Sequence, residues 1–242
     1  MADMKALLAG AGLCLKRDTL EALERYRALL LDWNGRMDLT SVAGEEMAAR
    51  HFLDSLLPLK NAELFPPNAR VIDVGTGAGF PGLPLAIARP DLSVTLLEAQ
   101  GKRCQFLNTV RGELGLANAE VIQERAEVLG RAEGRREAYD RAVARAVAPL
   151  NVLCEYLLPF VRVGGCALCW KGPAVTAEME DGAAAAIALG GKAGPLLEMA
   201  APGLDTRHVV VQIYKTEKTL PQYPRKNGIP GKRPLKSGRN CG

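Results

Sequence analysis

The sequence has few of the residues that build metal centres and nucleophilic triads. Only two histidines occur, His51 and His208, and they lie far apart in the chain. The six cysteines are scattered, and the one C-x-x-C pair, Cys166 and Cys169, lies in a buried-strand pattern instead of at a helix start. Because thiols are acidified mainly at helix starts or beside cations, this position predicts core cysteines and not a zinc or redox site. We expect reduced thiols, a cytoplasmic location and no metal.

Long hydrophobic runs are also absent, since none reaches the roughly 18 residues that span a membrane. An apolar run at residues 6–15 has the length of a signal-peptide core. Lys16 and Arg17 follow it at once, however, and no small-residue cleavage site precedes them, so we interpret it as a buried helix turn. The 242 residues, 48% hydrophobic, suit one α/β domain with an appendage, which we expect to be monomeric.

Acidic residues are scarce at the C-terminal end. From Lys215 onward, Glu217 is the only acid against eight lysines and arginines, which gives +7 for this end and −3 for residues 1–214. A basic, Pro/Gly-rich end on a slightly acidic body suggests a polyanionic partner. The alternative is a solvated tail held open by self-repulsion, and composition does not decide between the two.

Strand and helix patterns alternate through the middle of the chain. The expected strands are 70–75, 93–99, 119–125, 139–147, 165–172 and 208–215, and the expected helices are 81–89, 102–115, 150–161 and 177–191. This alternation predicts a largely parallel sheet with helices on both faces and a ligand site beyond the carboxyl ends of its strands. Two earlier helices, at about 20–34 and 45–57, are expected to form an N-terminal cap.

A glycine-rich loop follows the first expected strand. Gly75, Gly77 and Gly79 allow a sharp turn that exposes backbone N–H groups to a ligand. The dinucleotide fingerprint G-x-G-x-x-G fails at Phe80 when counted from Gly75, and is met only weakly when counted from Gly77 to Gly82.

Two features argue against a dinucleotide, the acid Asp73 and the pair Phe80 and Pro81. Asp73, just before the glycines, repels a pyrophosphate and attracts a cationic or amine-bearing ligand. Phe80 and Pro81 fill the place where a pyrophosphate needs bare backbone. Glu98, at the end of the second strand, can accept both hydroxyls of a ribose. We therefore expect S-adenosylmethionine, although a simple turn with a solvated Glu98 remains an alternative.

Three stretches, DVGTGAGFPGLPLAI, EAQGKRCQFL and RAVARAVAPL, closely resemble the bacterial 16S ribosomal RNA (guanine-N7) methyltransferases, the glucose-inhibited division protein B family. The likeness extends over WNGRMDLTSV, RHFLDSL, WKGP, RHVVVQIYK and YPRKNGIPGKRPL. It implies a Rossmann-like, seven-stranded class I methyltransferase sheet, S-adenosylmethionine as donor, and N7 of one guanine in 16S rRNA or a small-subunit precursor as acceptor. We divide the chain into an N-terminal helical cap (1–65), a methyltransferase core (66–215) and a basic tail (216–242).

The resemblance also implies site residues. Its motifs place cofactor contacts at Gly75, Phe80, Glu98, Ala99, Gln100, Ala126, Glu127 and Arg145. The loop itself adds Asp73, Gly77 and Gly79. One departure from the family is Asp38, where Asn is common, which puts a charge near the cap.

Guanine N7 carries a free lone pair and no hydrogen, so its methylation needs positioning and no general base. Arg145 and Lys171, at the ends of their strands, are expected to position the substrate through guanine O6 or a phosphate, although capping of helix ends is an alternative for both. His51, Asp54 and Ser55 share one side of their helix, which is either a lid over the cleft or solvated surface.

The tail is expected to contact RNA phosphates. The candidates are Lys215, Arg225, Lys226, Lys232 and Arg233, with Tyr214 and Tyr223 available to stack on bases. Such contacts position RNA without reading its sequence, and they predict steep salt dependence. A methyltransferase acting on a small molecule or protein, an NAD-dependent oxidoreductase and a non-catalytic RNA-binding protein stay open as alternatives.

Overall fold

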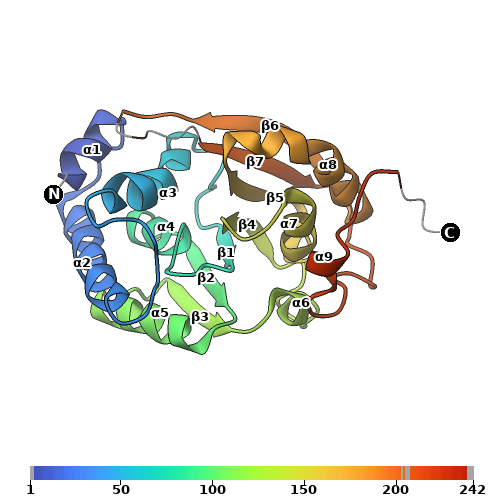
Figure 1. Cartoon of the computed structure of the whole chain (residues 1–242), viewed down its shortest axis with the longest axis horizontal. Coiled ribbons are helices and arrows are strands. Elements are labelled where there is room, and N and C mark those ends of the chain that lie inside the picture. Colours follow the sequence, from blue (N-terminus) through green and yellow to red (C-terminus); the bar gives the residue numbers. More distant parts are fainter. Residues whose placement is uncertain (1–2, 203, 205–207, 239–242) are drawn as a thin grey trace.

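A seven-stranded sheet forms the centre of the molecule, in a computed structural model that describes residues 3–202, 204 and 208–238. The strand order is β3-β2-β1-β4-β5-β7-β6. The strands are β1 (Arg70–Val74), β2 (Ser93–Glu98), β3 (Ala119–Gln123), β4 (Tyr139–Arg145), β5 (Val161–Lys171), β6 (Gly191–Met199) and β7 (His208–Lys215). β1 to β5 run parallel, and β7 and β6 complete the sheet antiparallel. The expected α/β fold is confirmed (Figure 1).

Helices cover both faces of this sheet. The α-helices are α1 (Met4–Gly10), α2 (Arg17–Asn34), α3 (Asp54–Leu56), α4 (Gly82–Ala88), α5 (Gly101–Glu113), α6 (Ala126–Leu129), α7 (Leu150–Leu157), α8 (Met179–Ala188) and α9 (Ile229–Lys232). A π-helical turn, η1 (Ala48–Leu53), and two 3-10 turns, η2 (Leu57–Lys60) and η3 (Pro173–Glu178), accompany them.

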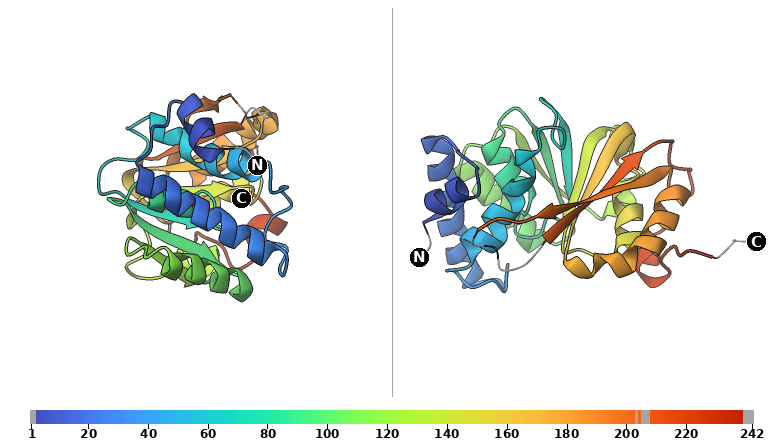
Figure 2. Two further views of the ribbon diagram at one scale, coloured as in Figure 1. Left: turned by 90° about the vertical axis from the view of Figure 1, so that its left-hand side faces the viewer. Right: turned by 90° about the horizontal axis from the view of Figure 1, so that it is seen from above.

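Successive residues of each strand point to opposite faces, and each face has its own hydrophobic core. On β1, Val71 packs into the core shared with α1, α2, α4 and α5, whereas Ile72 packs into the core shared with α7 and α8. The right-hand view of Figure 2 shows the N-terminal helices on one side and the helices of the yellow and orange part of the chain, α7 and α8, on the other. The sheet is therefore wound on both faces, as the alternating pattern predicts.

Cys166 and Cys169 lie in the core of β5. Both thiols are buried, and burial raises the pKa of Cys166 to about 11. The pair faces neighbouring positions of β7, Tyr214 and Val211. Among the described residues no disulfide or group of metal ligands forms, so the structure supports core packing for this pair.

The N-terminal helices are tied to the glycine loop. Tyr26 of α2 is fully buried and donates its hydroxyl hydrogen to the carbonyl of Ala78. Its ring stacks on Phe80, with centroids 5.2 Å apart. The helix expected at about 45–57 is divided into η1, α3 and the start of η2. These elements thereby help to fix the loop that follows β1.

One strand escapes the sequence patterns. β6 contains Gly191, Gly194 and Pro195, residues that weaken a strand signal. Pairing with β7 is interrupted between Ala193 and Leu196, and the strand lies at the edge of the sheet, where proline is tolerated. Because the pairing is irregular, the residues of β6 do not alternate regularly, and the sequence pattern does not predict the strand.

The C-terminal segment is not an open, self-repelling tail over residues 216–238. It packs along the side of the molecule that carries α6, α7 and α8, and it includes α9 (Figure 1). Arg131 and Arg136 donate hydrogen bonds to its backbone carbonyls. Arg239 and Cys241, at the end of the expected tail, lie outside the described residues.

Candidate active site

The loop that follows β1 lies where the strand order reverses, because β2 and β4 flank β1 on opposite sides. Gly75, Gly77 and Gly79 have φ values of 69°, 61° and 102°, a region that side chains rarely adopt. The N–H groups of Gly75 and Thr76 bond to the carbonyl of Leu97 in β2, at 2.9 and 3.1 Å. The glycines thus let the chain turn tightly against the end of the neighbouring strand.

Asp73 lies beneath this loop and is fully buried. Its Oδ2 accepts hydrogen bonds from Thr76 Oγ1 at 2.6 Å and from the Gly82 amide at 2.8 Å. Its Oδ1 has no hydrogen-bond partner among the described residues. Burial raises the pKa of Asp73 to about 6, although the bonds from Thr76 and Gly82 act to lower it. A buried, unpaired acceptor fits a ligand that brings a positively charged donor, as the sequence suggests for Asp73.

Glu98 ends β2 with both carboxylate oxygens turned to backbone N–H groups. Oε2 accepts from Gly77 at 3.0 Å, and Oε1 accepts from Gln100 at 2.9 Å. The side chain is 5% exposed, which excludes a solvated strand-end acid. Each oxygen keeps one lone pair beyond these bonds, so the carboxylate can still accept two hydroxyl groups.

A cavity opens beside the loop, and we call it the glycine-loop cavity. It is lined by residues at the ends of β1 to β3, by α6 and α7, and by the segment after β4. Of the expected cofactor residues, the lining contains Gly75, Glu98, Ala99, Ala126 and Glu127. These residues come from the ends of β1 and β2 and from α6, at the edge of the sheet where this fold binds ligands.

The other expected cofactor residues lie outside this lining. Gln100 is the N-cap of α5, where its amide bonds to Glu98. Phe80 is buried in an aromatic cluster, stacked on His51 with centroids 4.5 Å apart. Arg145 lines a second cavity, described next. Gly77 acts through its bond to Glu98, and Gly79 through its backbone conformation.

The second cavity, which we call the arginine cavity, lies beyond the ends of β4 and β5. Its charged lining is strongly cationic, and Asp38 is the single carboxylate among the described residues that line it. The cationic side chains are Arg50, Arg103, Arg145 and Lys171. Asp38, the departure from the family pattern, therefore belongs to this cavity. One chain segment borders both cavities, because residues 145–146 line the arginine cavity and residues 147–149 line the glycine-loop cavity.

Arg145 is held tightly at the end of β4. Nη1 donates to Asp54 Oδ2 at 2.9 Å and to the Arg50 carbonyl at 3.0 Å. Nη2 lies 3.0 Å from His51 Nδ1, and Cζ lies 5.0 Å from the centre of the Phe80 ring. A guanidinium has five N–H groups, so two remain for a ligand in the cavity after these three bonds.

His51 is neutral and its tautomer is fixed. Burial lowers its pKa to about 3, and the charge of Arg145 adds to this effect. Since Arg145 can only donate, Nδ1 must accept, and Nε2–H must donate to Thr40 Oγ1 at 2.7 Å. Thr40 Oγ1 also accepts from the Val42 amide, so its own hydrogen is left to point to the cavity that it lines.

The polar face formed by His51, Asp54 and Ser55 is buried, which excludes the solvated surface, and His51 lines the arginine cavity. A lid over the cleft stays a prediction. Asp54 is fully buried between Arg145 and His208, whose Nδ1 lies 2.6 Å from Asp54 Oδ1. Ser55 donates to the carbonyl of His51 at 2.6 Å. The face points inward, where Asp54 pairs with Arg145 at the end of β4 and with His208 at the start of β7.

Lys171 is less available to a phosphate than the sequence suggests. Its Nζ lies 2.8 Å from Glu178 Oε2 and donates to the Ala148 carbonyl at 3.1 Å. Glu178 also accepts from the Leu150 amide at the start of α7. Lys171 therefore ties the segment after β4 to η3, while lining the arginine cavity.

Two of the expected RNA contacts are internal. Lys215 is buried, where its ammonium donates to the Leu158 carbonyl at 2.7 Å and lies 3.2 Å from Glu137 Oε1. Arg225 forms a two-pronged pair with buried Glu155. The expectation of an exposed phosphate contact is therefore wrong for Lys215, whereas the Arg225 side chain is partly exposed and paired with Glu155. Charge alone does not reveal such a distant partner. The remaining candidates, Lys226, Lys232 and Arg233, are exposed.

The sequence reading missed a wall of the glycine-loop cavity. Tyr156 of α7 and two C-terminal residues, Gly231 and Pro234, line it. One signal was present: Glu155 is the only charged residue in the apolar helix LNVLCEYL, and such a position needs a partner when it is buried. Nothing in the sequence identified Arg225 as that partner.

The described part of the chain holds neither a metal-ligand group nor a membrane-spanning helix. Within residues 3–202, 204 and 208–238, no three His, Cys, Asp or Glu side chains are grouped closely enough to hold a metal ion. No helix within this part of the chain has both the length and the apolar character needed to cross a membrane.

Known structures share the fold at low identity. TYW2 from M. jannaschii, solved with AdoMet, is 16% identical with a TM-score of 0.51, covering 67% of this chain and 76% of that chain. MtNAS, solved with S-adenosylmethionine, is 16% identical with a TM-score of 0.55, covering 88% and 83% of the two chains. Identities this low support the fold alone.

Curated relatives are much closer in sequence. The ribosomal RNA small subunit methyltransferase G of Alkaliphilus metalliredigens is 45% identical over 226 residues, covering 93% of this chain and 94% of the relative. That of Moorella thermoacetica is 44% identical over 240 residues, covering 97% and 100%. The GidB family model, described as rRNA small subunit methyltransferase G, matches residues 19–210, and the chain belongs to this family.

Proposed function

We propose that the protein transfers the methyl group of S-adenosylmethionine to ribosomal RNA of the small subunit. The observation that carries this proposal is the pair of cavities that meet at residues 145–149. One cavity offers carboxylates and the first glycine of the loop, and the other offers cations. Carboxylates suit a donor that carries an amine and a ribose, and cations suit a polyanionic acceptor. Two adjoining cavities with these properties would hold donor and acceptor close enough for transfer between them.

The glycine-loop cavity is the proposed donor site. S-adenosylmethionine supplies an activated methyl group on a sulfonium when bound. Glu98 would accept the ribose hydroxyls, and Asp73 would favour the positive charge of the amino acid head. Ala126 and Glu127 would border the adenine. Asp73 also opposes a pyrophosphate, which argues against an NAD-dependent oxidoreductase.

The arginine cavity is the proposed acceptor site, with guanine N7 of 16S rRNA as the atom that is methylated. This choice rests on the family resemblance, and the site chemistry agrees with it. His51 has no free lone pair, because Nδ1 accepts from Arg145 and Nε2–H donates to Thr40, so it cannot act as a general base. N7 needs no base. Arg145 would orient guanine O6 or a neighbouring phosphate through its two remaining N–H groups.

RNA would extend from this cavity over exposed cations. Lys226, Lys232 and Arg233 are exposed near the glycine-loop cavity, whose lining includes the adjacent Gly231 and Pro234. Backbone phosphates carry no sequence information, so these residues would position the RNA and leave recognition to the arginine cavity. A ribosomal substrate implies action in the cytoplasm, and the proposed reaction requires only one copy of the chain.

The test uses small subunits and free 16S rRNA from cells that lack the protein, incubated with labelled S-adenosylmethionine. We expect label at one guanine, detected by reduction and aniline cleavage, which breaks RNA at 7-methylguanine. Gly75→Asp should abolish the transfer, since a β-carbon there would lie 3.1 Å from Val147. Gly112→Asp, on an open face of α5, is the matched control. Label on a protein or small molecule only, or a thermal shift with NADH only, would contradict the proposal.

A further inference from the structure

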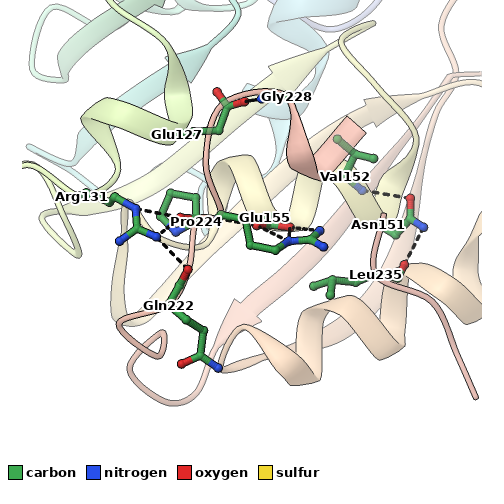
Figure 3. A network of polar contacts seen from close by, with 10 residues as sticks. Glu127, Arg131, Asn151, Val152, Glu155, Gln222, Pro224, Gly228 and Leu235 are labelled. Carbon is green, nitrogen blue, oxygen red and sulfur yellow. Dashed lines mark hydrogen bonds and ion pairs between the residues drawn. The ribbon is translucent and has the colours of Figure 1, made fainter. Parts of the chain in front are cut away.

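The C-terminal segment Thr219–Ser237 crosses the mouth of the glycine-loop cavity instead of projecting into solvent. At its start, Arg131 donates to the Pro224 carbonyl at 2.8 Å and to the Gln222 carbonyl at 2.8 Å. Near its end, Ser237 donates through its amide to Asp181 Oδ1 at 2.9 Å. Figure 3 shows the bonds of Arg131 to Gln222 and Pro224. The whole segment is therefore fixed in place by the core.

The central anchors come from the two helices that border the cavity. Glu127 of α6 accepts from the Gly228 amide at 2.9 Å, and Asn151 of α7 donates to the Leu235 carbonyl at 2.7 Å (Figure 3). The chain between these two points includes α9 and must pass from α6 to α7. Gly231 and Pro234 lie on this stretch, and both line the cavity. The crossing thereby supplies one wall of the proposed donor site.

An ion pair between Glu155 and Arg225 fixes the position of the C-terminal segment against α7. Glu155 of α7 is fully buried and accepts from the Arg225 amide at 2.7 Å, from Nε at 3.0 Å and from Nη2 at 2.6 Å. A pair with this geometry fixes both position and direction, because the guanidinium fork fits the carboxylate in one plane. Arg225 lies on the N-terminal side of Gly231 and Pro234, the residues of the segment that line the cavity. Its role is therefore tied to the core and not to a phosphate in solvent.

We propose that the C-terminal segment is a wall of the S-adenosylmethionine site, positioned by the Glu155–Arg225 pair, and that it sets donor affinity. This inference rests on the proposed function, since it assigns the glycine-loop cavity to the donor. Gly231 and Pro234 contact the bound nucleoside, and Arg225 is a positioning residue. The basic residues of the segment thus have two separate uses, with Arg225 fixing the wall through Glu155 and Lys226, Lys232 and Arg233 facing solvent.

Gly231 offers a direct way to test the wall. A β-carbon at this position would meet only Tyr156 Oη, at 3.9 Å, and Tyr156 lines the same cavity. The backbone at Gly231 does not have a positive φ, so a side chain is tolerated there. Phenylalanine at this position occupies space in the cavity while leaving the anchors intact. Gly112→Phe, on an exposed turn of α5 with nothing within 4 Å of a β-carbon, adds the same group elsewhere.

The experiment measures binding of S-adenosylhomocysteine to the full chain by calorimetry, together with thermal unfolding without ligand. We expect Gly231→Phe and Arg225→Gln to weaken binding at least tenfold. Lys236→Gln, which removes an equal charge from an exposed position of the same segment, and Gly112→Phe should stay within twofold of the original protein. If Arg225→Gln does not fold, Gly231→Phe decides the outcome alone.

Three results would contradict the proposal that the C-terminal segment is a wall of the donor site. One is unchanged binding in Gly231→Phe. Another is a folded Arg225→Gln variant that loses RNA affinity but keeps full affinity for S-adenosylhomocysteine, which would make Arg225 a phosphate contact. The third is failure of the unaltered protein to bind S-adenosylhomocysteine at all, which contradicts the proposed function itself and is thus distinct from the first two.

Discussion

The carboxylate of Asp54 bridges two basic side chains, with Oδ2 2.9 Å from Arg145 Nη1 and Oδ1 2.6 Å from His208 Nδ1. Asp54 is fully buried, so its charge depends on these partners. Asp54→Asn removes the charge and leaves the Arg145 guanidinium poorly compensated. We expect a loss of about 3–5 kcal/mol in the free energy of unfolding, measured by urea denaturation. Asp32→Asn breaks the exposed pair with Arg36 and should cost less than about 1 kcal/mol. Equal effects would contradict the bridging role.

Arg145→Lys should separate positioning from donor binding. Lysine keeps the charge but cannot contact Asp54, His51 and a ligand at once through a planar fork. We expect methyl transfer to fall about 100-fold, the scale associated with a misplaced reactant. Affinity for S-adenosylhomocysteine should stay within a few-fold. A larger loss of that affinity than of turnover would assign Arg145 to the donor site.

Glu98→Gln tests the proposed ribose contact. The amide replaces one acceptor by a donor, which cannot accept the Gly77 or Gln100 N–H and cannot accept a hydroxyl hydrogen. We expect affinity for S-adenosylhomocysteine to fall about 10- to 100-fold, in line with the loss of one or two charge-assisted hydrogen bonds. Glu21→Gln, on the exposed face of α2, is the control and should bind normally.

His51 predicts a specific pH dependence of stability. Its pKa is about 3 in the folded protein, mainly through burial, against 6.5 for a free side chain. The unfolded chain therefore takes up a proton first as the pH falls, and the stability from neutral His51 is lost between about pH 6.5 and 3. His51→Gln does not titrate there. Its cost, about 2 kcal/mol near neutral pH, should shrink by pH 4. A cost in urea unfolding that does not change with pH would contradict the assignment.

The exposed end of the C-terminal segment predicts the salt dependence of RNA binding. Replacing Lys226, Lys232 and Arg233 by Gln should lower the slope of log affinity against log salt by about 2, if each residue neutralises one phosphate. Lys5, Lys16 and Arg17 are exposed near the opposite end of the molecule (Figure 1). Their triple replacement changes the net charge equally, so an equal change in slope would argue against a located contact.

The sequence predicted the donor site best where the signal is local. Gly75, Asp73 and Glu98 are recognisable because a glycine loop and a strand-end acid follow from neighbouring residues. The C-terminal segment was misread because its partners are remote. Arg225 meets Glu155, 70 positions earlier, and Lys215 meets Glu137, so charge composition could not tell a buried pair from an exposed contact.

The segment from Arg145 to Pro149 connects the two cavities, so binding in one cavity can change the affinity of the other. Residues 145–146 line the arginine cavity and residues 147–149 line the glycine-loop cavity, so ligands in the two cavities would border neighbouring residues of one segment, which includes Ala146 with a φ of 55°. Thermodynamic linkage is reciprocal, so the factor by which S-adenosylhomocysteine changes the affinity for RNA equals the factor by which RNA changes the affinity for S-adenosylhomocysteine. If S-adenosylhomocysteine and methylated RNA lower each other's affinity through this segment, binding of one product would favour release of the other. Both sites would then be free for the next turnover.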